Sequence, residues 1–241
     1  MAQSSETKKA EIAEIIGQLI PMADAVEQGH IRPKYQAVLN VAHGWIRRIV
    51  RTNRAILLLQ ANGFNGEVAP LARSVVEHSV ALRWLIADGE DIMAPLRTNH
   101  YTGTSRFFEA WRSSTTVEPD EEQIAEELRA LENDDHRRDH LQQFAHRVKL
   151  YGTPSDLTVY QAELNVAHAT YQSAAVYCSF DQTERLPEAE DSGNYDMFCA
   201  VYLYLAMIAF SAIFVARPWQ GELAAIRARL IRLERDVDKW I

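Results

Sequence analysis

Arg73, Glu77 and His78 form a charged group within a segment whose apolar residues otherwise repeat at helical spacing. At about 100 degrees per residue, Arg73 and Glu77 lie about 40 degrees apart on one helix face, whereas His78 lies about 140 degrees from Arg73. Charged side chains on a helix that packs into a core cost free energy unless they are paired or serve a purpose. The group therefore predicts either an ion pair within the helix or one half of an acid–base site.

The other half of such a site is His168, which follows Tyr160 and Leu164 on one flank of a later helical segment. A histidine among Val and Ala side chains is either a hydrogen-bonded core residue or a ligand or base. If Arg73, Glu77 and His168 converge into a buried polar cluster, an acid–base group beside an anion-binding guanidinium would suit phosphate chemistry. The candidate catalytic residues are Arg73, Glu77, His78 and His168.

Four basic side chains share one face of the preceding helical segment, within about 80 degrees of one another. They are His43, Arg47, Arg51 and Arg54. A solvated helix face explains such a stripe, but RNA phosphates or an acidic helix of a partner could also dock on it. These four side chains are therefore the candidate nucleic-acid-binding residues.

The spacing of His136 and His140 is that of two helical metal ligands. The neighbouring Arg137 and Arg138 would oppose a bound cation, and the glutamate base of zinc hydrolases is missing. No phosphate-cradling Gly loop, nucleophile elbow or dinucleotide fingerprint occurs, which excludes hydrolysis of nucleotides by a P-loop mechanism. We expect no metal and no cofactor.

Composition predicts an all-α protein with one domain over residues 1–241. The 241 residues, 47% of them hydrophobic, can bury a large core, and 10 Gly and 8 Pro leave few turn signals for an all-β fold. The formal charge of -8 argues against a broad phosphate-binding surface and leaves room for a local basic stripe. The two cysteines, Cys178 and Cys199, fit no zinc spacing and are expected to be free thiols in a reducing cytoplasm.

Apolar periodicity and stop signals predict a single bundle of about eight or nine helices. The uncharged run at about 197–216 is long enough to cross a bilayer, yet its tyrosines and the lack of flanking basic clusters favour a buried central helix. An exposed acidic helical pair is expected at about 118–150. The other expected helices cover about 5–29 with a bend at Pro21, 33–62, 66–87, 90–112 with a weak point at Thr102–Thr104, 155–180, and an amphipathic stripe at 223–237.

Two short motifs carry a resemblance to a known family. Residues 73–77 read Arg-Ser-x-x-Glu, and residues 160–168 read Tyr-x-x-x-Leu-Asn-x-x-His. Together they resemble a widespread uncharacterised bacterial helical family, over roughly residues 35–215. That family implies an all-helical fold and no settled activity.

A second resemblance rests on Arg73 and His78, whose Arg-x-x-x-x-His spacing is similar to that of the HEPN superfamily. Ser74 stands where the ribonucleases of that superfamily commonly have Asn, Asp or His. The resemblance implies an all-helical, metal-independent ribonuclease of toxin or phage-defence type, with two motifs of a homodimer facing one cleft.

We therefore expect a cytoplasmic helical interaction or regulatory protein, of phage-defence or stress type, built around a polar cluster of Arg73, Glu77 and His168. The alternative is a HEPN-like ribonuclease that uses Arg73 and His78 on RNA. A homodimer is expected in either case, because several helices carry more apolar surface than a small bundle core needs. A protein partner fits the first hypothesis, and no membrane association is favoured.

Overall fold

A computed structural model describes residues 5–24, 30–114, 143–168 and 195–233, together with positions 122, 125, 126 and 129. Within these ranges the regular elements are helices, and the β contact present is an isolated bridge between Ile31 and Phe214. The predicted all-α class is confirmed. The predicted count of eight or nine helices includes segments outside the described residues. Most of the acidic pair at 118–150 and the His136–His140 motif also lie outside them.

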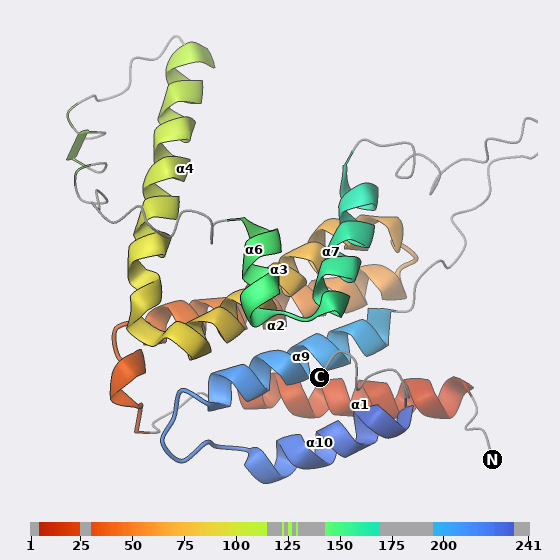
Figure 1. Cartoon of the computed structure of the whole chain (residues 1–241). Coiled ribbons are helices and arrows are strands. Elements are labelled where there is room, and N and C mark those ends of the chain that lie inside the picture. Colours follow the sequence, from red (N-terminus) through yellow and green to blue (C-terminus); the bar gives the residue numbers. More distant parts are fainter. Residues whose placement is uncertain are drawn as a thin grey trace, which may run out of the picture.

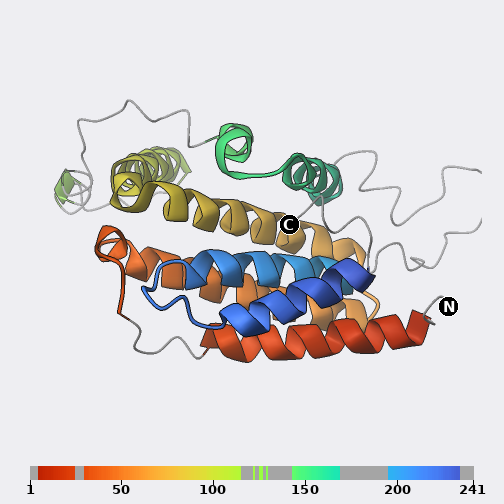
Figure 2. The same cartoon turned by 60° about the horizontal axis from the view of Figure 1, so that its bottom comes forward.

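Helix α9 (Tyr195–Ser211) is the centre of the bundle. It packs against α1 (Ser5–Asp24), α2 (Leu39–Ala61), α3 (Ala69–Asp88) and α10 (Gln220–Leu233). Figures 1 and 2 show these helices running along one another, with α9 in their midst. Side chains are buried on almost every side of α9, as expected for a helix whose sequence is apolar all round.

The apolar run is therefore a core helix. No candidate for a bilayer-spanning segment occurs among the described helices, α9 included. Its end at Ser211, earlier than the expected residue 216, follows from the chain turning away to form the bridge at Phe214. Cys199 of α9 is a free, buried thiol, whereas Cys178 lies outside the described ranges.

A second layer covers one face of α3. Helices α6 (Phe144–Tyr151) and α7 (Pro154–Ala167) both contact α3, and Figures 1 and 2 show them crossing it at a steep angle. Helix α4 (Met93–Ser114) leaves the end of α3 and projects from the bundle (Figure 1). The layer places α7 side chains directly over the middle of α3.

Several helix boundaries differ from those expected. The chain at Pro33–Tyr35 forms a separate 3₁₀ turn, since the Tyr35 hydroxyl donates to the carbonyl oxygen of Ile86 at 2.8 Å and fixes this turn against α3. A second 3₁₀ turn at Gly66–Val68 precedes α3, and a third at Gly89–Ile92 follows it. Helix α4 continues through the expected weak point, where the Thr102 hydroxyl donates to the Thr98 carbonyl oxygen at 2.9 Å.

Helix α1 contains Pro21 and is described to Asp24, and the expected continuation to Gly29 falls outside the described ranges. Helix α7 is described to Ala167, and the expected continuation to residue 180 falls outside the described ranges.

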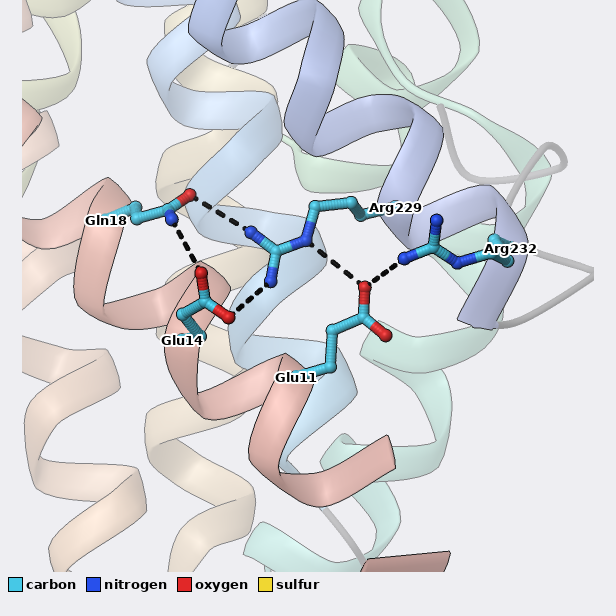
Figure 3. Close-up of polar contacts among 5 residues, drawn as sticks. All are labelled: Glu11, Glu14, Gln18, Arg229 and Arg232. Atoms are coloured by element: carbon cyan, nitrogen blue, oxygen red, sulfur yellow. Dashed lines mark hydrogen bonds and ion pairs between the residues drawn. The ribbon is translucent and has the colours of Figure 1, made fainter. Parts of the chain in front are cut away.

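A polar network ties α10 to α1. The guanidinium of Arg229 is bonded to three side chains of α1 (Figure 3), namely Glu11, Glu14 and Gln18, at 3.2, 3.0 and 3.3 Å. Arg232 also pairs with Glu11. Arg229 is 19% exposed and Arg232 is 61% exposed, so solvent screens the second arginine far more.

The network predicts unequal costs for two matched substitutions. We expect Arg229→Met to lower the free energy of unfolding by about 1 to 3 kcal/mol, because three acceptors lose their shared charged donor. Arg232→Met should cost less than about 1 kcal/mol. Urea unfolding followed by circular dichroism measures the free energy of unfolding of both variants. Equal losses in the two variants would contradict the larger structural role given to Arg229.

Candidate functional site

Arg73 and Glu77 lie one turn apart on the face of α3 that α7 covers. Arg73 Nε is 3.3 Å from Glu77 Oε1, and the two side chains are 28% and 31% exposed. The expected ion pair within the helix is present, at the rim of the layer rather than deep in the core.

His168 joins this pair from the C-terminal end of α7. Its Nε2 lies 3.2 Å from Nη1 of Arg73. A guanidinium has only donors, so the imidazole must accept through Nε2 and carry its proton on Nδ1. The predicted convergence of Arg73, Glu77 and His168 is thus found in the structure, with His168 exposed rather than buried.

Aromatic rings complete the cluster. The Arg73 guanidinium carbon stands 4.8 Å from the centroid of the Tyr160 ring, which stacks on Phe144 of α6 at 4.0 Å. Burial, and then the nearby Glu77 carboxylate, raise the pKa of Tyr160 above its usual value. We call Arg73, Glu77, Tyr160 and His168 the Arg73 cluster; it joins α3 to both α6 and α7.

His78 forms its hydrogen bonds with Ser74 of its own helix and not with the Arg73 guanidinium. Its Nδ1 is 2.7 Å from the carbonyl oxygen of Ser74, an arrangement in which Nδ1–H donates along its own helix. Burial lowers the pKa of His78, and the positive charges of Arg48 and Arg147 lower it further, against the raising effects of the Ser74 hydrogen bond and of Glu77. His78 therefore lies within reach of the charges of Arg48 of α2 and Arg147 of α6, and its hydrogen bonds stay within α3.

Arg147 of α6 extends this positive region. Burial lowers the pKa of Arg147, while Glu77 and Tyr160 act in the opposite direction. Its Nε atom is buried without a hydrogen-bond partner among the described residues. No pattern in the sequence selects Arg147, because its neighbours on α3 are about seventy residues away in the chain.

The predicted basic stripe of α2 divides into two parts. Arg47 and Arg51 line a groove between α2 and α3, and a third arginine, Arg48, joins them there. Arg54 instead pairs with Asp24 of α1 at 2.9 Å, and His43 is half-buried outside the groove lining. Arg48 was missed because a single helical wheel places it about 100 degrees from Arg47, whereas the groove is formed by two helices.

We call this feature the arginine groove. It has a volume of about 490 Å³ and is lined by Gly44, Arg47, Arg48, Arg51, Thr52, Ala55 and Leu71. Its three arginines are exposed, and no carboxylate in the described part of the chain forms an ion pair with them. The groove is therefore a concentrated positive surface that lacks a described counter-charge.

Sequence reasoning also missed Asp156 at the start of α7, the most buried charged side chain among the described residues. Its carboxylate, 1% exposed, accepts from Arg83 of α3 at 2.7 Å and from the Tyr202 hydroxyl of α9 at 3.0 Å. It also accepts from the backbone N–H of Thr153 at 2.6 Å, as part of a capping box. The Thr153-x-x-Asp156 spacing is the sequence signal that marks this helix start.

These contacts predict a strong dependence of stability on Asp156. Asp156→Asn should lower the free energy of unfolding by about 3 kcal/mol, since Arg83, which is 20% exposed, would lose its counter-charge. Asp24→Asn is the matched control in an exposed ion pair, and should cost less than about 1 kcal/mol. Chemical denaturation of both variants measures these losses. A loss for Asp156→Asn as small as that for Asp24→Asn would contradict the structural role of Asp156.

Glu163 of α7 faces the start of α9, where the Tyr195 hydroxyl donates to its two carboxylate oxygens at 3.4 Å. Burial raises the pKa of Glu163 from 4.5 to about 7, although the Tyr195 hydrogen bond acts to lower it. The folded state thus keeps a proton on Glu163 up to about pH 7, whereas the unfolded chain releases it near pH 4.5. Raising the pH between these values therefore favours unfolding.

Glu163→Gln should remove this pH dependence. We expect the variant to match the wild type near pH 4 and to exceed its stability at pH 8 by on the order of 1 kcal/mol, a value reduced for the exposed part of the side chain. Thermal unfolding at several pH values measures the difference. A variant less stable than the wild type at pH 8 would show that the carboxylate is charged and stabilising there.

The comparisons with known proteins give one match. A family model described as a family of unknown function (DUF5677) covers residues 39–185, a range that contains both the arginine groove and the Arg73 cluster. Searches of curated proteins and of solved structures found no match. The resemblance to an uncharacterised helical family is confirmed at this level, and the resemblance to HEPN proteins stays a prediction. Because the matched range is more than half of the 241 residues, the chain belongs to DUF5677, a family of unknown function.

Proposed function

We propose that this protein is a helical interaction or regulatory protein that binds an anionic ligand in the arginine groove. The observation that carries the proposal is the set of Arg47, Arg48 and Arg51, three exposed guanidiniums that share one groove and have no described carboxylate partner. Like charges at i,i+4 spacing, as in Arg47 and Arg51, destabilise a helix. A bound anion would offset that repulsion.

The charge of the whole chain strengthens this proposal. A formal net charge of -8 repels anions in general, so a local group of arginines with no carboxylate partner among the described residues is a departure from that overall charge. Arg54, on the same helix, shows the ordinary alternative, an exposed pair with Asp24. A binding role explains why the other three lack such partners in the described chain.

The Arg73 cluster supports a role in holding the binding face together. Arg73 interacts with Glu77, Tyr160 and His168, so its donors are directed at side chains of α3 and α7. The cluster fixes the outer layer on α3, the helix that forms one wall of the groove. The homodimer and the cytoplasmic location remain predictions from the sequence.

The first test measures anion binding. Sulfate, citrate and tripolyphosphate are added at low salt, and the shift in unfolding temperature is recorded for the wild type, for the double variant Arg47→Gln/Arg51→Gln and for Arg54→Gln. We expect stabilisation by at least one multivalent anion, its loss in the double variant and its retention in Arg54→Gln. No stabilisation by any of them, or equal effects in all three proteins, would overturn the proposal.

The second test addresses the ribonuclease alternative. Purified protein should leave RNA intact, because the Arg73 guanidinium is engaged with α7 and His78 is bonded to Ser74 on another face. The assay compares the wild type with Arg73→Ala and His78→Ala after circular dichroism has established that each is folded. Cleavage by the wild type that both substitutions abolish would favour the ribonuclease over the interaction protein.

A further inference from the structure

We infer that the ligand of the arginine groove is a phosphate ester of nucleotide size. The inference rests on the proposed function and goes beyond it by assigning the chemical class and the size of the anion. Charge density, groove volume and the apolar part of the lining each contribute a separate argument.

The charge density of the groove fits phosphate better than carboxylate. Arg47 and Arg51 are one helical turn apart, about 6 Å along the axis, and Arg48 lies between them in sequence. A phosphate ester presents up to two negative charges and three strong acceptor oxygens, whereas a carboxylate has one charge and two oxygens. Guanidinium forks bind phosphate oxygens in pairs, so three of them match a phosphate chain.

The apolar part of the lining fits an organic group attached to that phosphate. Leu71 of α3 and Ala55 of α2 line the same groove as the arginines, together with Thr52. The volume of about 490 Å³ lies within the range of roughly 300 to 1,000 Å³ that small-molecule sites occupy. Inorganic phosphate alone would leave the apolar wall uncovered.

The same dimensions argue against a long nucleic acid. The α2 side of the groove runs from Gly44 to Ala55, which is about 16 Å of helix. A strand longer than this would extend over a protein of net charge -8, where general repulsion weakens binding of a polyanion. Arg54, the next arginine along α2, is already paired with Asp24.

The positive field around the groove reaches α3 and α6. Arg48 of the groove and Arg147 of α6 both act on His78, whose pKa is lowered mainly by burial. The Nε atom of Arg147 is buried and lacks a described hydrogen-bond partner. Arg147 also interacts with Glu77, so the positive charge that a bound phosphate would meet comes from the three arginines of α2.

Isothermal titration calorimetry without divalent cations tests the assignment with four probes. These are ATP, tripolyphosphate, citrate and a 20-nucleotide single-stranded RNA. We expect ATP to bind roughly tenfold or more tightly than tripolyphosphate, and tripolyphosphate to bind more tightly than citrate. The RNA should bind more weakly than ATP.

Three variants locate the binding energy. Arg47→Gln/Arg51→Gln should weaken ATP and tripolyphosphate by roughly tenfold or more, because it removes two charged donors. Leu71→Ser should weaken ATP and leave tripolyphosphate unchanged. Arg54→Gln is the matched control and should leave both affinities unchanged. Circular dichroism and thermal unfolding establish that each variant is folded before titration.

The outcomes separate this inference from the proposed function. Citrate binding as tightly as tripolyphosphate, with dependence on Arg47 and Arg51, would overturn the phosphate assignment and leave an anion-binding groove. Equal affinities for ATP and tripolyphosphate would overturn the inference that the ligand carries an organic group. RNA binding more tightly than ATP would overturn the inference that the ligand has the size of a nucleotide. Failure of every anion to bind would overturn the proposed function itself.

Discussion

The carboxylate of Asp156 is the contact on which the two-layer arrangement depends. It receives donors from α3 through Arg83, from α9 through Tyr202 and from its own helix start through Thr153. A carboxylate that is 1% exposed is tolerated only because these donors replace water. The same three contacts fix where α7 begins, so they also determine which of its residues lie over α3.

The position of α7 in turn sets the chemistry of the Arg73 cluster. Once Asp156 is anchored, Tyr160 follows one turn later over Phe144, and His168 reaches Arg73 at the far end of the helix. Helix α3 then has two different faces. One face is covered by α6 and α7 and is rich in internal polar contacts, whereas the other forms the arginine groove with α2.

The features that depend on a single helix could be predicted from the sequence. The uncharged apolar run located the core of α9, and the positions of Arg73 and Glu77 on one helix face predicted their ion pair. The meeting with His168 could be proposed only as a condition, because it depends on how two distant helices cross. That condition is met in the structure, and its catalytic meaning stays untested.

Features that arise between helices were missed or altered. Asp156 reads as an ordinary helix start, and only the approach of Arg83 and Tyr202 makes it an enclosed ionic group. Arg48 belongs to a groove rather than to a stripe, and Arg54 turns to α1 instead. Single-helix geometry carries no information about which neighbouring helix lies within reach of a long side chain.

The pairing of the first and last described helices has a consequence for how the chain folds. Helix α1 packs against α9 and α10, and Arg229 contacts Glu11 across more than two hundred residues of sequence. Contacts between such distant residues must close a long loop before they contribute free energy, which slows folding. During synthesis the apolar face of α1 therefore stays without its main partner until α9 has left the ribosome, and for that period the nascent bundle is open to chaperones and to aggregation.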